Sequence, residues 1–161
     1  MNKLINVIWL PGQLHDEMSI LASNAYPNET GGLLIGYDAG NGLVITAITG
    51  PGPNAIHKPN TLTPDYAYHD AEIERIYSES GRRHTYLGDW HSHPDGGSML
   101  SSKDKRTLRA IAEYQPARAP SPIMGILDGG PPWRFAAWRH FPRSLRMRRL
   151  FDRYEQMILI P

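Results

Sequence analysis

The sequence contains no cysteine among its 161 residues. Disulfides and thiolate metal sites are therefore excluded, so any bound metal must be held by histidine, aspartate or glutamate. The absence of cysteine also fits a reducing compartment, where disulfides are rare.

Long apolar runs are missing as well. The apolar N-terminal stretch ends at Pro11 and lacks the long core and small-residue cleavage site of a signal peptide. No other stretch is long enough to cross a bilayer. The net charge is only +1, so bulk electrostatics favour neither nucleic acid nor an acidic partner. We expect a soluble cytoplasmic protein that has no membrane partner.

The overall composition is that of a globular protein, with 40% hydrophobic and 20% charged residues. The length fits one ordinary domain that can bury a hydrophobic core. No internal repeat, low-complexity tract or long linker divides the chain, so we expect a single domain over residues 1–161.

Local patterns predict a layered α/β domain with a mixed sheet. Short apolar runs between turn residues predict strands at 5–10, 32–37, 43–49, 85–90, 123–127 and 133–138. Helical spacing predicts helices at 14–25, from 64–65 to Gly81 with Thr63 as N-cap, and from Ser101 or Ser102 to before Pro116. The arginine-rich tail, 142–159, is also expected to be helical. The glycines and prolines of 50–55 indicate a loop.

The residues most suited to chemistry follow the predicted strand 85–90. His91 and His93 are two positions apart, so on an extended strand both imidazoles point to one face. Pro94 then turns the chain. Ser101 and Asp104 are three positions apart, which places them together at the first turn of the next helix.

Two imidazoles and one carboxylate suffice for a catalytic zinc ion that keeps a fourth position for water. Zinc lowers the pKa of such a water to about 7. A His-x-His pair by itself more often lines a polar surface or binds metal adventitiously. The downstream carboxylate, with a serine beside it, shifts the interpretation toward a metal site.

The spacing resembles a known signature. His91-Ser-His93, the seven residues 94–100 that begin with Pro94, and Ser101-Ser-Lys-Asp104 are similar to the His-x-His-x7-Ser-x2-Asp motif of JAMM (JAB/MPN+) metalloproteases. That family also carries an upstream glutamate before a glycine-rich strand, which Glu29 matches. The resemblance implies a JAB/MPN-type domain: a curved mixed sheet flanked by helices, layered as in cytidine deaminases.

The resemblance also implies a role for each matching residue. His91, His93 and Asp104 would bind Zn²⁺. Glu29 would take a proton from the attacking water and deliver it to the leaving amine. Ser101 would donate its hydroxyl to the developing oxyanion. The alternatives are a solvated loop charge for Glu29 and a plain helix N-cap for Ser101.

A narrower resemblance extends over most of the chain. The segments 49–57, 63–65 and 86–94 are similar to those of stand-alone bacterial JAB proteins of CBASS antiviral operons. That likeness implies an isopeptidase that cleaves the amide bond between a CD-NTase C-terminal tail and its target. A ubiquitin-activating and conjugating-like enzyme would make this bond. The substrate tail would be extended and carry small residues near the scissile bond.

Other interpretations stay open. The enzyme could instead be a deubiquitinase-like peptidase that processes a ubiquitin-like or sulfur-carrier protein. The domain could also be a non-catalytic MPN-type scaffold, although such scaffolds usually lack part of the metal set. Nucleic-acid binding through the arginine-rich tail is a third, disfavoured reading. Asn54 could contact substrate or simply stabilise its turn, and His57 lacks the spacing of a ligand.

Overall fold

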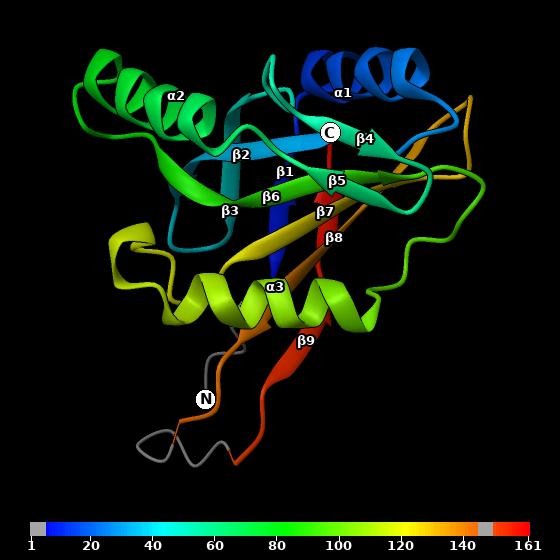
Figure 1. Ribbon diagram of the computed structural model, residues 1–161. Coiled ribbons are helices and arrows are strands. Elements are labelled where there is room, and N and C mark those ends of the chain that lie inside the picture. The colour runs from blue at the N-terminus through cyan, green and yellow to red at the C-terminus, as the bar shows by residue number, and fades with distance from the viewer. Residues whose placement is uncertain (1–5, 145–149) are drawn as a thin grey trace.

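The computed structural model describes residues 6–144 and 150–161 (Figure 1). The helical elements of this part are α1 (Gly12–Ala25), α2 (Tyr66–Glu79), α3 (Ser102–Glu113) and a short 3₁₀ turn, η1 (Gln115–Ala117). The strands are β1 (Val7–Trp9), β2 (Gly31–Asp38), β3 (Leu43–Ile48), β4 (Ile56–Lys58), β5 (Thr61–Thr63), β6 (Thr85–His93), β7 (Ile123–Asp128), β8 (Arg134–Phe141), β9 (Arg153–Gln156) and β10 (Ile158–Ile160).

The main sheet is mixed, as the sequence predicts. Its strand order is β10-β1-β3-β2-β6-β7-β8-β9. β2 and β3 form a hairpin, since they pair antiparallel, whereas β6 and β7 run parallel. The predicted α/β layering with a mixed sheet is therefore confirmed, and β6, which carries the two histidines, lies in its middle.

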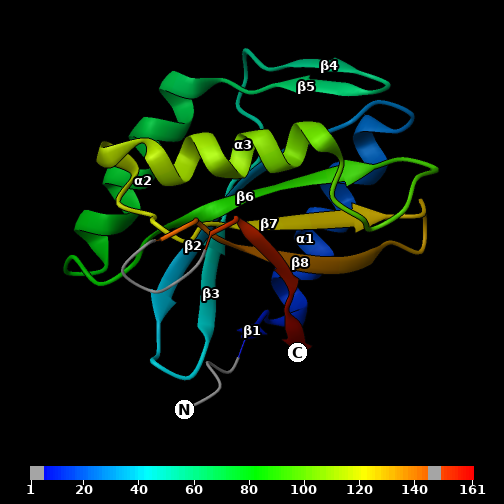
Figure 2. The ribbon, with the colours of Figure 1, turned by 90° about the horizontal axis from the view of Figure 1, so that it is seen from below.

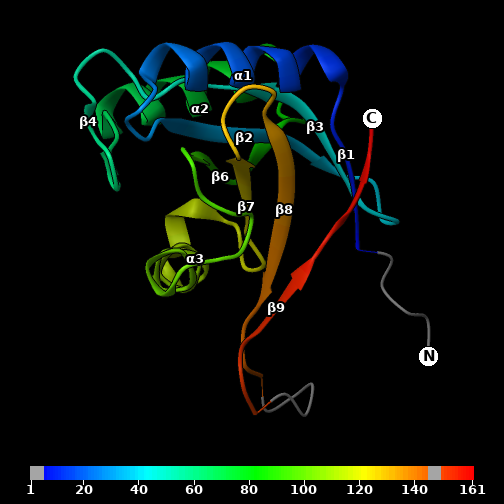
Figure 3. The ribbon, with the colours of Figure 1, turned by 90° about the vertical axis from the view of Figure 1, so that its right-hand side faces the viewer.

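The C-terminal segment connects the two ends of this sheet. β9 pairs antiparallel with β8, and β10 pairs parallel with β1. Only Met157 separates the two strands, and its N–H donates to the Ala137 carbonyl at 2.8 Å. In Figure 3 the red C-terminal segment passes from β8 to β1. The sheet is consequently strongly curved, and its edges lie close to each other.

The two faces of the sheet carry different helices. Along β7, Ile123 and Leu127 belong to the core cluster that contains Met18 of α1. The alternate residue Ile126 belongs to a second cluster that contains Leu108 of α3. Figure 2 shows α1 and α3 on opposite sides of β6 and β7. Side-chain alternation along a strand therefore decides which helix a residue faces.

The predicted helix over 142–159 is wrong where the structure describes this segment. Residues 153–156 and 158–160 are strands, and residues 145–149 lie outside the described chain. The physical reason is that two existing strands, β8 and β1, offer their backbone groups to this segment. Such long-range pairing overrides a local preference for helix.

The predicted N-cap of α2 is also wrong. Thr63 ends β5, and the cap is Asp65, whose carboxylate accepts the Tyr68 N–H. The sequence patterns predicted no element over residues 56–63, where the β4–β5 hairpin lies. No helix of the described residues is long and apolar enough to cross a membrane.

Candidate active site

The C-terminal half of β6 presents both histidines to the side of the sheet that α3 covers. His91 is the register partner of Ile126 on β7, and Ile126 packs in the cluster of Leu108 on α3. His93 lies two residues further and shares this face. Gly31 lies opposite His91 on β2, where an added Cβ would be only 2.3 Å from the Trp90 carbonyl oxygen. Close strand approach therefore demands glycine beside the site.

The first turn of α3 positions Asp104. Ser101 is the N-cap, and its hydroxyl oxygen accepts the Asp104 N–H at 3.1 Å. The Asp104 carboxylate accepts the Ser101 N–H at 2.7 Å in return. This reciprocal capping box fixes the rotamer of Asp104 and satisfies two helix-end donors. The other carboxylate oxygen, Oδ1, is the one that lies nearest His91.

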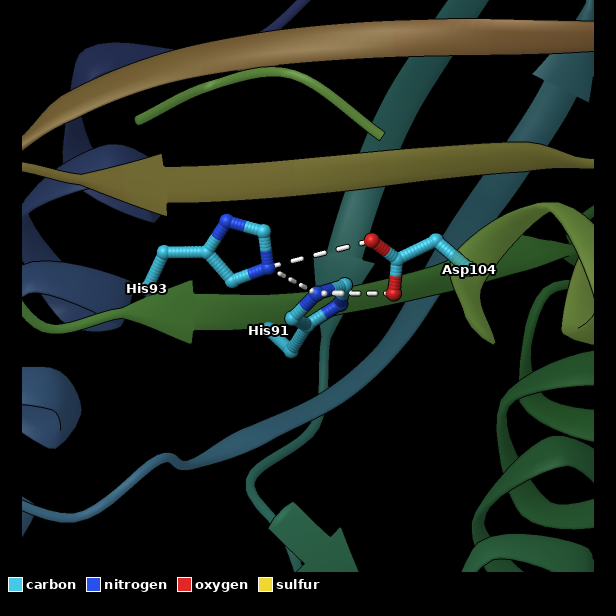
Figure 4. Close-up of side chains that lie close together, drawn as sticks. All are labelled: His91, His93 and Asp104. Atoms are coloured by element: carbon cyan, nitrogen blue, oxygen red, sulfur yellow. Dashed lines mark hydrogen bonds and ion pairs between the residues drawn. The ribbon is translucent and has the colours of Figure 1, made fainter. Parts of the chain in front are cut away.

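The three side chains meet in space (Figure 4). The two Nε2 atoms of His91 and His93 are 2.8 Å apart. The Asp104 carboxylate oxygens lie 3.3 Å from Nε2 of His91 and 3.8 Å from Nε2 of His93. Ligands about 2.0–2.1 Å from a tetrahedral zinc ion are separated by about 3.3 Å. The cluster therefore has the donor types and the spacing that a metal ion needs.

Neighbouring groups set the tautomer of His93 and the ionisation of Asp104. The Nδ1 atom of His93 lies 2.7 Å from the Gly97 carbonyl oxygen, which can only accept, so Nδ1 carries the hydrogen. Its Nε2 is then free to bind a metal. For Asp104, burial acts to raise the pKa, but hydrogen bonds from His91 and Ser101 hold the pKa well below its usual value. The carboxylate is therefore ionised, as a ligand must be.

Glu29 lies just before β2, and its backbone passes beside β6, the strand of the two histidines. The next residue, Thr30, donates its N–H to Ser92 Oγ at 3.0 Å and accepts the Ser92 N–H at 2.8 Å. Ser92 stands between the two histidines, so Glu29 is held next to the cluster. Burial raises the pKa of the Glu29 carboxyl, while the charges of His91 and His93 lower it. The structure thus brings Glu29 within electrostatic reach of both imidazoles.

The remaining predicted residues are placed differently. Ser101 is exposed, and its hydroxyl oxygen accepts the Asp104 N–H; its role as a donor to the oxyanion stays a prediction. The side-chain amide of Asn54 donates to the Asp65 carboxylate at 2.9 Å. Asn54 therefore stabilises the turn before α2, and a contact with substrate stays a prediction.

The loop between His93 and Ser101 is tied down at several points. The hydroxyl of Tyr26 donates to the carboxylate of Asp95, with oxygen distances of 2.9 and 3.0 Å. The indole N–H of Trp138 donates to the Ser98 carbonyl at 2.8 Å. Asp95 adopts a left-handed backbone conformation with φ of 58°, which is uncommon for a residue other than glycine. The loop is thus anchored at both Asp95 and Ser98 by residues outside it.

Sequence reasoning missed the role of the β4–β5 hairpin beside Glu29. The Glu29 N–H donates to the Lys58 carbonyl of this hairpin at 2.9 Å, and Nδ1 of His57 contacts the Glu29 carbonyl oxygen. A signal was available, because two short runs with a β-branched residue each, 56–58 and 61–63, flank a Pro-Asn turn.

Comparison with known proteins decides the family. The model of the family described as "Prokaryotic homologs of the JAB domain" matches residues 11–140, which include the whole cluster. The chain belongs to this JAB family. It is a JAMM-type metal-dependent hydrolase with metalloprotease or isopeptidase activity.

Individual relatives of this JAB protein support the family assignment. It is 41% identical over 153 residues to "Probable metalloprotease y4qB" of Sinorhizobium fredii, covering 92% of each chain. A "CD-NTase/cGAS isopeptidase" of Vibrio cholerae is 31% identical over 81 residues, which are 50% of this chain and 52% of that protein. One of Enterobacter hormaechei is 30% identical over 113 residues, 65% of this chain and 57% of that protein.

The fold of the JAB chain has a solved counterpart. The solution structure of protein DSY2949 from Desulfitobacterium hafniense matches with a TM-score of 0.66 at 22% identity, covering 96% of this chain and 93% of that one. At this identity the likeness supports the fold alone. The predicted JAB/MPN-type fold is confirmed.

Proposed function

We propose that the chain is a zinc-dependent isopeptidase that hydrolyses the amide bond between a protein C-terminal tail and its target. The tail is that of a CD-NTase in a CBASS antiviral system. The observation that carries this proposal is the convergence of His91, His93 and Asp104 on one point, with Glu29 beside them.

Zinc is the proposed metal because of the donor set. Two imidazole nitrogens and a carboxylate, with no thiolate, are typical of catalytic zinc sites. Bound there, zinc would supply Lewis-acid activation of water and of the scissile carbonyl. The capping box around Asp104 and the Gly97 carbonyl bonded to His93 would keep the ligands aligned.

Glu29 and Ser101 would handle the proton and the charge. The carboxylate of Glu29 would accept the proton of the attacking water and then donate it to the leaving amine nitrogen. Its partial burial raises its pKa, which makes it a better proton acceptor. The hydroxyl of Ser101 would donate to the oxygen that gains charge in the transition state. The capping bond from the Asp104 N–H uses the acceptor side of this hydroxyl.

The substrate assignment is supported by the relatives named CD-NTase/cGAS isopeptidases and by the motif-bearing loops that resemble CBASS proteins. To test it, we would join a CD-NTase through its C-terminus to a reporter protein by a peptide bond. Fusions of ubiquitin and of a sulfur-carrier protein serve as comparators. We expect release of the intact CD-NTase from the first fusion only, detected by mass spectrometry. Cleavage of only a comparator would contradict the CD-NTase assignment.

Glu29→Gln tests the catalytic mechanism. The amide cannot accept a proton, so we expect turnover to fall by about 10²–10⁴-fold while about one zinc ion per chain is retained. Glu74→Gln, an exposed substitution on α2, is the matched control and should change neither quantity. Full activity of Glu29→Gln would refute the general-base role.

A further inference from the structure

The β4–β5 hairpin forms a two-stranded sheet of its own, separate from the eight-stranded sheet. Figure 2 shows it outside the main sheet, on the side where α3 lies. Its strands have only three residue pairs, which is too few for independent stability. The hairpin must therefore gain its order from contacts with the rest of the protein.

Both backbone groups of Glu29 bond to this hairpin. The Glu29 N–H donates to the Lys58 carbonyl at 2.9 Å. Nδ1 of His57 lies 2.8 Å from the Glu29 carbonyl oxygen. A carbonyl oxygen can only accept, so His57 Nδ1 is the donor. The hydrogen bond exists whether the imidazole is neutral or protonated.

The position of Glu29 in the chain makes these bonds important. The ladder of the main sheet begins at Gly31, so Glu29 lies before its first pair. On the other side, Thr30 is held by Ser92. The backbone that carries the catalytic carboxyl is therefore fixed between the hairpin and the metal-binding strand. Removal of the hairpin bonds would leave Glu29 without a hydrogen bond to its own backbone groups, held only through its neighbours Asn28, which donates to the Ala25 carbonyl, and Thr30.

We propose that His57 is a positioning residue for Glu29. The inference rests on the proposed role of Glu29 in proton transfer. That transfer requires the carboxylate within about 2.6–3.2 Å of its partner, and a displacement of about 1 Å can lower the rate about 10²-fold. His57 restrains the backbone from which this carboxyl projects, and it acts through Glu29 without contact to the reacting atoms.

Two substitutions separate positioning from other roles of His57. His57→Leu removes the donor. His57→Asn retains one, because the Asn side-chain nitrogen is the same number of bonds from Cβ as Nδ1 of histidine. His84→Leu and His84→Asn are matched controls. Nδ1 of His84 also makes a side-chain hydrogen bond, with Thr46 at 3.1 Å, but His84 lies before the first residue of β6, at the end of the strand away from His91 and His93.

With the CD-NTase–reporter fusion as substrate, we expect His57→Leu to lower kcat about 10–100-fold, with KM and zinc content unchanged. His57→Asn should recover most of kcat, and both His84 variants should match the wild type. A wild-type kcat in His57→Leu, no recovery in His57→Asn, or loss of zinc would overturn the proposal.

Amide hydrogen exchange of Glu29, measured by NMR without substrate, gives a second readout. The Glu29 N–H should exchange at least several-fold faster in His57→Leu than in the wild type or in His57→Asn. Equal exchange would overturn the inference even if the enzyme cleaves its substrate. If the wild type cleaves no fusion, the proposed function fails, and the exchange data still decide whether His57 fixes Glu29.

Discussion

Ser101 shows how one hydroxyl can serve both the fold and the chemistry. Its oxygen accepts the Asp104 N–H, so it begins α3 and helps to orient Asp104, the proposed metal ligand. Its hydrogen is the donor that we assign to the oxyanion. The two roles use different parts of the same group, so substitutions can separate them.

Ser101→Ala and Ser101→Gly should lower kcat equally, by about 10²–10³-fold, because both lack the donor. Their stabilities should differ. Alanine at an N-cap costs about 0.5–2 kcal/mol, whereas glycine costs only a few tenths. Steady-state kinetics and chemical denaturation of the two variants measure both effects. If the kinetic loss follows the loss of stability, with Ser101→Gly nearly as active as the wild type, the oxyanion role is wrong.

At the scale of elements, α2 depends on a carboxylate that the sequence did not identify. Asp65 accepts hydrogen bonds from the backbone of Tyr68 and from the backbone and side chain of Asn54. The backbone bond from Tyr68 and those from Asn54 lower the pKa of Asp65. The 50–65 segment, which leads from β3 to α2, is therefore organised around this charge.

This lowered pKa predicts a pH-dependent stability. The folded-state pKa of Asp65 is below its unfolded value of about 3.9, so its stabilising effect is complete above that value and is lost as the pH falls through the folded pKa. Asp65→Asn should therefore be less stable than the wild type at pH 7, and the difference should shrink at pH 3. Urea denaturation at both values measures this. Asp70→Asn, an exposed substitution on the same helix, is the control. A difference that stays constant with pH would contradict the capping role of the charge.

At the scale of the whole molecule, the proposed metal site joins two elements that are separate in sequence. His91 and His93 come from β6, and Asp104 comes from α3. Because the unfolded chain does not present this arrangement, metal binding contributes to folding stability. The proposed general base, Glu29, lies just before β2, so the proposed site depends on three parts of the fold.

Removal of metal should therefore lower the melting temperature of the wild type. Zinc at 100 times its dissociation constant stabilises the folded state by about 2.7 kcal/mol, which a chelator would abolish. His91→Ala should bind no stoichiometric zinc and should melt at one temperature with or without chelator. His84→Ala serves as control and should behave like the wild type. Calorimetry with metal analysis checks this, and equal zinc content in His91→Ala would contradict the assignment.

The sequence by itself determined the elements whose signals are local. The i, i+2 spacing of His91 and His93 and the three-residue spacing of Ser101 and Asp104 predict which side chains share a face, because strand and helix geometry fix it. Only the tertiary structure decided the rest. Residues 153–156 and 158–160 are strands because they pair with β8 and β1, and the fold brings His57 into contact with Glu29. Both depend on contacts between residues far apart in the chain, which local patterns do not encode.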